Sequence, residues 1–135
     1  YRDRISLVVI MLQKEVADRI ISSSHSKKYG ILSVLIQTFF EVRKIVDVES
    51  KSFDPPPKVQ SSVIKLIRND VLNIGVEFSF FKTVVKSSFQ RRRKILRNAL
   101  KNLNLQDKFH HDIFSKRAEE LSSDDFIWLS KYLKN

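Results

Sequence analysis

Phe53 is the residue whose setting most clearly suggests chemistry, because it stands just before all three prolines of the chain. Residues 53–66 read FDPPPKVQSSVIKL. Proline holds φ at about −65° and pushes the residue before it toward extended geometry, so residues 54–57 are predicted to form a stiff, polyproline-like rod. Such a rod would hold the ring at a defined angle, as stacking on a flat ligand requires. In the alternative interpretation, the prolines cap an edge strand and Phe53 belongs to the core.

Lysine and arginine dominate residues 82–101, where no acidic residue occurs. A helix over 92–103 would gather cations on one face and apolar residues on the other. Cations at a helix N-terminus oppose the macrodipole by about 0.3 to 1 kcal/mol each, and a phosphate-bearing partner would offset that cost. In the alternative interpretation the run is an ordinary solvated face. The cations are Lys82, Lys86, Arg91, Arg92, Arg93, Lys94, Arg97 and Lys101.

The composition favours a globular protein with a polyanionic partner. The 135 residues are 42% hydrophobic and carry 25 Lys and Arg against 15 Asp and Glu, for a net charge of +10. Nucleic acid is the obvious polyanion. The absence of cysteine excludes disulfides and cysteine-ligated zinc, and it fits a reducing compartment. His110 and His111 lack the companions of a metal site, so no metal is predicted. No apolar run is long enough to cross a membrane.

Hydrophobic patterns divide the chain into a mixed part and a helical part. Residues 5–12 are almost continuously apolar, which is typical of an interior strand of a parallel sheet buried on both faces. Ser122 and Asp125 have the spacing of a capping box and predict the start of a last helix. The other expected elements are helices over 13–22, 31–40, 77–89 and 92–103, strands over 42–48 and 58–67, and a linker over 68–74.

The segment from Phe53 to Leu66 resembles a late motif of the ribosomal RNA adenine N6-dimethyltransferases, with the pattern Phe-x-Pro-Pro-Pro-Lys-Val-x-Ser-x-Val-x-x-Leu. One departure is Arg91, where members of the family usually carry Gln. Four further blocks stand in the family's order. They read MLQKEVADRI over 11–20, YGILSV over 29–34, RRKILRNAL over 92–100 and RAEELS over 117–122.

The resemblance implies an α/β fold, namely the C-terminal part of a class I (Rossmann-like) methyltransferase sheet followed by a small all-α domain. Residues 1–70 would complete the catalytic domain, with strands 42–48 and 58–67 as an antiparallel pair, and residues 71–135 would form a helical RNA-binding domain. The family's Gly-rich turn and Asn-Leu-Pro-Tyr motif do not occur. We therefore expect S-adenosylmethionine to bind the full-length parent and not this chain. The strand over 5–12, without its parallel neighbour, would expose an edge and promote self-association.

The resemblance also implies a function for the parent protein. It would be a cytoplasmic, S-adenosylmethionine-dependent transferase that dimethylates adjacent adenosines near the 3′ end of small-subunit rRNA. Its partners would be that rRNA and the small ribosomal subunit, whose maturation it would assist. One alternative is a macrolide-resistance methyltransferase acting on large-subunit rRNA. Another is a non-catalytic nucleic-acid-binding relative such as a mitochondrial transcription factor.

Individual residues receive roles from the same resemblance. Methylation of an exocyclic amine requires the adenine to leave its stack, and Phe53 is the ring predicted to stack on the flipped base. Pro55 and Pro56 would form walls of the substrate pocket. No catalytic, cofactor-binding or metal-binding residue is expected in this chain. The predicted RNA-binding residues are Arg92, Arg93, Lys94, Arg97 and Lys101.

Overall fold

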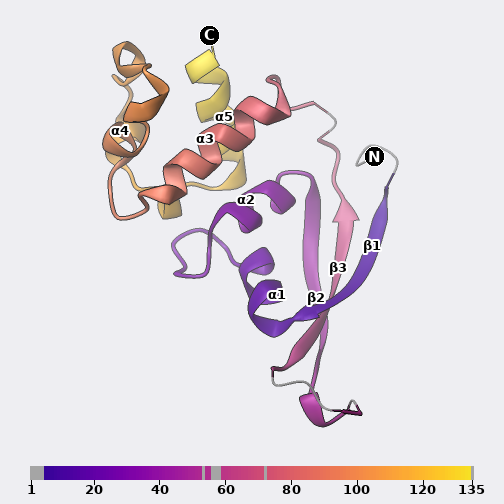
Figure 1. The fold of residues 1–135 in the computed structure, drawn as a ribbon. Coiled ribbons are helices and arrows are strands. Elements are labelled where there is room, and N and C mark those ends of the chain that lie inside the picture. Colours follow the sequence, from indigo (N-terminus) through magenta and orange to yellow (C-terminus); the bar gives the residue numbers. More distant parts are fainter. Residues whose placement is uncertain (1–4, 53, 56–58, 72, 135) are drawn as a thin grey trace.

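A twisted three-stranded sheet carries a helical layer on one face and a larger helical unit at one end (Figure 1). The computed structural model describes residues 5–52, 54–55, 59–71 and 73–134. None of the helices in these ranges is long and apolar enough to cross a membrane.

The sheet contains β1 (Leu7–Gln13), β2 (Phe40–Val48) and β3 (Ser61–Arg68) in the order β1-β3-β2. Both neighbouring pairs are antiparallel, which confirms the expected pairing of the second and third strands. The register of β2 against β3 shifts between Lys44 and Val46. A short 3-10 helix, η2 (Ser50–Ser52), follows β2 and leads toward the proline segment.

Two short helices, α1 (Lys14–Ile21) and α2 (Ile31–Gln37), follow β1. They confirm the helices predicted over 13–22 and 31–40, although both end earlier than predicted. The first packs on the central strand, where Ala17, Ile20 and Ile64 form a small buried core. The apolar residues of α1 recur at helical spacing, so that one stripe meets the sheet and the opposite side stays polar.

The strand β1 forms as predicted, but the prediction that it is buried on both faces is wrong. Leu7, Val9 and Met11 point away from α1, and their exposed fractions are 52%, 56% and 50%. The reason is that β1 pairs only with β3 among the described residues, and none of the helices described covers this face of the sheet. Self-association through its unpaired edge stays a prediction.

The helical unit confirms the helix predicted over residues 77–89 and the last helix predicted to start at Ser122. Ser122 and Asp125 form the expected capping box: the Ser122 N–H donates to Asp125 Oδ2 at 3.0 Å, and the Asp125 N–H donates to Ser122 Oγ at 3.2 Å. The α-helices are α3 (Phe78–Gln90), α4 (Leu96–Ala99) and α5 (Ser123–Lys134), and the 3-10 helices are η3 (Lys101–Leu103), η4 (Gln106–Lys108), η5 (Asp112–Ser115) and η6 (Ala118–Glu120).

The single helix expected over residues 92–103 is wrong. Residues 91–93 form a turn, and Ile95 adopts an extended conformation because it pairs with Arg117 in an isolated antiparallel bridge. The Leu96 N–H donates to the Lys116 carbonyl oxygen at 2.8 Å. The helix therefore begins only at Leu96, so the macrodipole argument for the preceding cations does not hold. Of the apolar residues expected on the buried face, Leu96, Ala99 and Leu100 are buried, whereas Ile95 and Leu103 are only partly buried.

The larger core runs across both parts of the chain. Tyr29, Val34 and Phe39 belong to the same buried cluster as Phe81 and Phe126 of the helical unit. The division at residues 70 and 71 stays a prediction, and the two parts on either side of it are packed together.

Candidate nucleic-acid interface

The chain that follows the prolines is joined to the end of β1 and the start of α1. Because β1 and β3 are antiparallel, Gln13 at the end of β1 lies opposite Ser61 at the start of β3. The Lys14 backbone N–H donates to the Gln60 carbonyl oxygen at 2.9 Å. This contact places the chain that follows the prolines beside the start of α1.

The predicted pocket residues are described only in part. Pro55 is exposed at the surface, joined to the exposed Asp54 by a cis peptide bond. Phe53 and Pro56 lie outside the described residues, and so does the second half of the predicted rod over residues 54–57. The stacking role of Phe53 and the wall roles of Pro55 and Pro56 therefore stay predictions.

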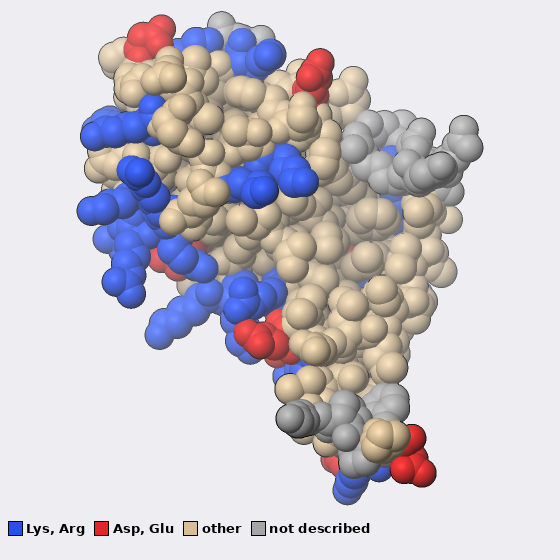
Figure 2. All heavy atoms as spheres, viewed as in Figure 1, with Lys and Arg blue, Asp and Glu red and all other residues tan. Residues whose placement is uncertain are grey.

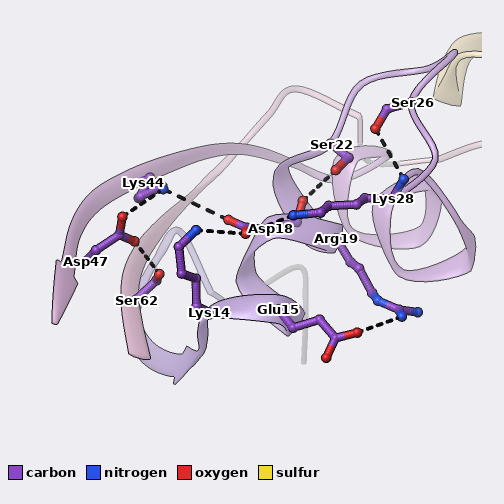
Figure 3. Close-up of polar contacts among 10 residues, drawn as sticks. All are labelled: Lys14, Glu15, Asp18, Arg19, Ser22, Ser26, Lys28, Lys44, Asp47 and Ser62. Carbon is purple, nitrogen blue, oxygen red and sulfur yellow. Dashed lines mark hydrogen bonds and ion pairs between the residues drawn. The ribbon is translucent and has the colours of Figure 1, made fainter. Parts of the chain in front are cut away.

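Beside this end of the sheet, Asp18 of α1 collects three lysines from different elements (Figure 3). Its carboxylate lies 3.0 Å from Lys14 Nζ, 3.2 Å from Lys28 Nζ and 3.9 Å from Lys44 Nζ. The side chain is only 14% exposed. The hydrogen bond from Lys14, together with that from Lys28, holds the pKa of Asp18 below its ordinary value despite the opposing effect of burial. The same hydrogen bond raises the pKa of Lys14.

Asp47 of β2 extends this network to the central strand (Figure 3). Ser62 Oγ donates to Asp47 Oδ1 at 2.6 Å, and Lys44 Nζ lies 3.2 Å from Asp47 Oδ2. These two hydrogen bonds, the one from Ser62 first, lower the pKa of Asp47. The network ties α1, β2 and β3 together next to the proline segment. The four-residue spacing of Lys14 and Asp18 is a local signal of one ion pair, whereas the contacts of Lys28, Lys44 and Ser62 depend on tertiary packing.

Most of the predicted RNA-binding cations are exposed and unpaired. Arg93, Lys94, Arg97 and Lys101 are exposed, as is Arg91, and none of the five has a carboxylate partner in the part of the chain that is described. They line two shallow hollows, one over residues 90–94 and one that includes Arg97, Lys101 and His110. Figure 2 shows Lys and Arg gathered on this side of the helical unit, over α4 and the turn before it.

Arg92 differs from its neighbours because it is used inside the molecule. Its Nη2 donates to the Tyr29 carbonyl oxygen at 3.0 Å and lies 3.5 Å from Glu119 Oε2. Its guanidinium carbon is 5.7 Å from the centre of the Phe89 ring. Arg92 therefore links the loop before α2 to the helical unit, a role that sequence reasoning missed.

Tyr29 is the centre of this junction. Its ring is buried and meets Phe89 edge-on at 5.9 Å between centroids. Burial raises the pKa of the Tyr29 hydroxyl. Nearby, the His25 N–H donates to the Glu119 carbonyl oxygen at 2.6 Å, so the loop before α2 is attached to η6 as well.

The histidine pair shows no metal geometry. No group of three His, Asp or Glu residues able to hold a metal occurs within the described ranges. His111 Nδ1 instead accepts a hydrogen bond from the Ile113 N–H at 3.1 Å, and its ring lies 4.6 Å from that of Trp128.

Comparison with known families confirms the resemblance seen in the motifs. The family described as ribosomal RNA adenine dimethylase matches residues 1–135. Ribosomal RNA small subunit methyltransferase A of Parabacteroides distasonis is 48% identical over 132 residues, which cover 96% of this chain and 50% of that protein. The Flavobacterium johnsoniae protein of the same name is 47% identical over 135 residues, covering 99% and 52%. The chain thus spans about half the length of these relatives.

Solved structures agree with the fold. A dimethyladenosine transferase from Plasmodium falciparum superposes with a TM-score of 0.84 at 28% identity, covering 96% of this chain and 57% of that one. The 23S rRNA methyltransferase ErmE superposes with a TM-score of 0.58 at 19% identity, covering 97% and 56%, a likeness of fold alone. The expected α/β fold, like that of the matching part of a Rossmann-like methyltransferase, is confirmed.

Proposed function

Because the chain belongs to the ribosomal RNA adenine dimethylase family, we propose that it forms the RNA-binding part and one wall of the adenine pocket of an S-adenosylmethionine-dependent dimethyltransferase. The substrate is a pair of adjacent adenosines near the 3′ end of small-subunit rRNA. The observation that carries this proposal is the 48% identity to ribosomal RNA small subunit methyltransferase A over nearly the whole chain.

The geometry supports a substrate site at the end of β1. The antiparallel pairing of β1 and β3 and the hydrogen bond from Lys14 to Gln60 bring the proline segment to this end. The Asp18 and Asp47 networks hold α1 against the sheet at the same place. A flipped adenine needs a fixed aromatic face, and Phe53 is the ring we assign to it.

RNA is gripped by the exposed cations of the helical unit. Arg93, Lys94, Arg97 and Lys101 have no carboxylate to neutralise them among the described residues, so phosphates are their natural counterions. Such contacts position RNA without reading its sequence. Arg92 also contributes to RNA binding, from the junction between the loop before α2 and the helical unit. There its guanidinium donates a hydrogen bond to the Tyr29 carbonyl oxygen.

The methyl donor does not fit the residues of this chain. A cofactor cradle needs glycines where a side chain would block the ligand. The Gly-rich turn and the Asn-Leu-Pro-Tyr motif, to which the resemblance assigns cofactor binding, do not occur in this chain, and a Cβ at Gly75 would meet Lys131. We assign S-adenosylmethionine to parts of the parent protein that this chain does not include. The parent would act in the cytoplasm on the small ribosomal subunit and assist its maturation.

Substitution of Phe53 in the full-length enzyme tests the proposal. Loss of base stacking costs about 1 to 3 kcal/mol, so Phe53→Ala should lower kcat/KM for small-subunit methylation about 5- to 150-fold. Phe53→Tyr should keep much of the activity. Phe53→Leu retains apolar volume without a π face and should be impaired like Ala, with an unchanged melting temperature. A fully active Leu variant would show that Phe53 is only a packing residue.

The substrate assignment has its own control. The same enzyme should methylate small-subunit particles and leave large-subunit rRNA unmodified. Methylation of the large-subunit rRNA alone would place the protein with the macrolide-resistance enzymes, and absence of methylation on both would support a non-catalytic role.

A further inference from the structure

Three aromatic side chains form a ladder at the surface of the helical unit, where the start of η5 meets α5. The Trp128 and Tyr132 rings stack at 5.1 Å between centroids with 14° between their planes, and the His111 ring lies 4.6 Å from that of Trp128. Trp128 is nevertheless 41% exposed. An exposed tryptophan within an aromatic patch is typical of a binding surface, because indole combines a large apolar face with a polar edge.

The aromatic ladder is fixed by contacts with the interior of the helical unit. The Tyr132 ring lies 5.9 Å from the ring of Phe114, which is fully buried. His111 is held by the hydrogen bond from the Ile113 N–H to its Nδ1. Trp128 is therefore presented in a defined position before any ligand arrives, so that binding would cost little additional side-chain entropy.

Two carboxylates flank the aromatic ladder. Asp124 precedes Trp128 by four residues on α5, which makes the two side chains neighbours on the helix surface, and Asp112 directly follows His111. Both aspartates are exposed, and neither has a cationic partner in the part of the chain that is described. In a protein with a net charge of +10, the surface around Trp128 is thus locally acidic.

The lysines of α5 make their contacts with other elements. The Lys131 side chain lies against Gly75 in the segment before α3, and Lys134 Nζ is 5.1 Å from the centre of the Phe80 ring of α3. Neither lysine pairs with the two aspartates. Because carboxylates repel phosphates, the charge beside the ladder disfavours an RNA backbone and favours a cation.

We propose that the aromatic ladder docks a basic protein segment, with an arginine of that segment over Trp128 and its guanidinium paired with Asp112 or Asp124. A guanidinium is planar, stacks on aromatic rings and pairs with carboxylates through its fork of N–H groups, so one side chain matches both features of the surface. Trp, Tyr and Arg are also the residues that contribute most to protein–protein binding. The ladder shares no residue with the predicted RNA-binding cations, so this partner is additional to RNA.

The single tryptophan of this chain allows the ladder to report its own occupancy. Fluorescence emission is followed at low ionic strength while a peptide of alternating Arg and Gly is added, and a peptide of alternating Glu and Gly is the charge control. The Arg peptide should change the Trp128 emission in a saturable way, and the Glu peptide should not. No saturable change with the Arg peptide, or the same change with the Glu peptide, would overturn the proposal.

Two double variants of equal charge change locate the site. Asp112→Asn with Asp124→Asn should weaken binding of the Arg peptide about fivefold, as the loss of two exposed ion pairs predicts. The control is Asp54→Asn with Asp70→Asn, which removes two exposed carboxylates that also lack ion-pair partners among the described residues. Its affinity should stay within about twofold of that of the unmodified protein, because charges beyond a Debye length are screened. Equal weakening by both double variants would show only a general effect of charge and would overturn the site.

A purely structural role of the aspartates gives a different result. Both stand in the first turn of a helix, where a carboxylate stabilises the helix dipole. Circular dichroism melting of the Asp112→Asn with Asp124→Asn variant measures that effect. A lower Tm with an unchanged peptide affinity would assign the two carboxylates to η5 and α5 alone and contradict docking.

RNA is the competing ligand for an aromatic surface. Oligouridine should leave the Trp128 emission almost unchanged, and a larger saturable response to oligouridine than to the Arg peptide would make the ladder a base-stacking surface instead. Trp128→Ala should weaken the Arg peptide about tenfold, measured by the fluorescence anisotropy of a labelled peptide. An unchanged affinity in this variant, with an unchanged melting temperature, would show that the peptide binds elsewhere.

Discussion

Replacement of Arg92 should lower the free energy of unfolding, whereas replacement of the adjacent Arg93 should leave it almost unchanged. The two arginines are neighbours in one basic run, but Arg92 contacts Tyr29 and Glu119 while Arg93 is exposed and unpaired within the described residues. Arg93→Ala is therefore a control that matches the change in residue type and charge.

The magnitude follows from the contacts that Arg92→Ala removes. A hydrogen bond from a charged group contributes about 1.5 to 3 kcal/mol, and a partly exposed ion pair adds up to about 1 kcal/mol. Because the Arg92 side chain is 38% exposed, we take about 2 kcal/mol for the lost free energy of unfolding. An unfolding entropy of about 2.1 cal/mol/K per residue over 135 residues converts this loss to a fall in Tm of about 7 °C.

Thermal unfolding followed by circular dichroism at low ionic strength measures both variants. We expect Arg93→Ala to stay within about 1 °C of the unmodified protein while it weakens RNA binding. Arg92→Lys keeps the charge but loses the planar fork, so it should recover only part of the lost stability. Equal melting temperatures for Arg92→Ala and Arg93→Ala would refute the internal role of Arg92.

Two further substitutions probe the network and the backbone. Asp18→Asn should lower the free energy of unfolding by about 1 to 2 kcal/mol at neutral pH. Because the pKa of Asp18 is lowered from 3.8 in the folded protein, its contribution is complete above pH 3.8 and is lost as the pH falls through the folded value. Urea titrations should therefore show the two proteins converging below pH 3.8, and a constant difference would contradict the network. Gly75→Ala should cost about 1 to 2 kcal/mol, since Gly75 has a φ of 83° and its new Cβ would crowd Lys131. Gly30→Ala, at an extended glycine with φ of −162°, is the control and should change Tm by little.

The family and several elements were readable from the sequence because their determinants are local. The capping box of Ser122 and Asp125 involves residues three apart, and the apolar spacing of α3 and α5 repeats with the helix. The motif around the prolines identified the family and the antiparallel pair that carries it. Phe53 itself lies outside the described residues, so its role still rests on the motif.

Tertiary structure alone decided what distant residues do to one another. The apolar spacing around Ile95 predicted a helix, but Ile95 is extended because it pairs with Arg117, and the helix begins only at the next residue. Arg92 and Arg93 look alike in sequence, and only the position of the Tyr29 carbonyl separates an internal arginine from a surface one. The free energy of such contacts depends on how the two parts pack, which no spacing along the chain encodes. The sequence by itself thus determined the family and the number of cationic side chains. The packing determined which of these side chains are exposed and available to bind RNA.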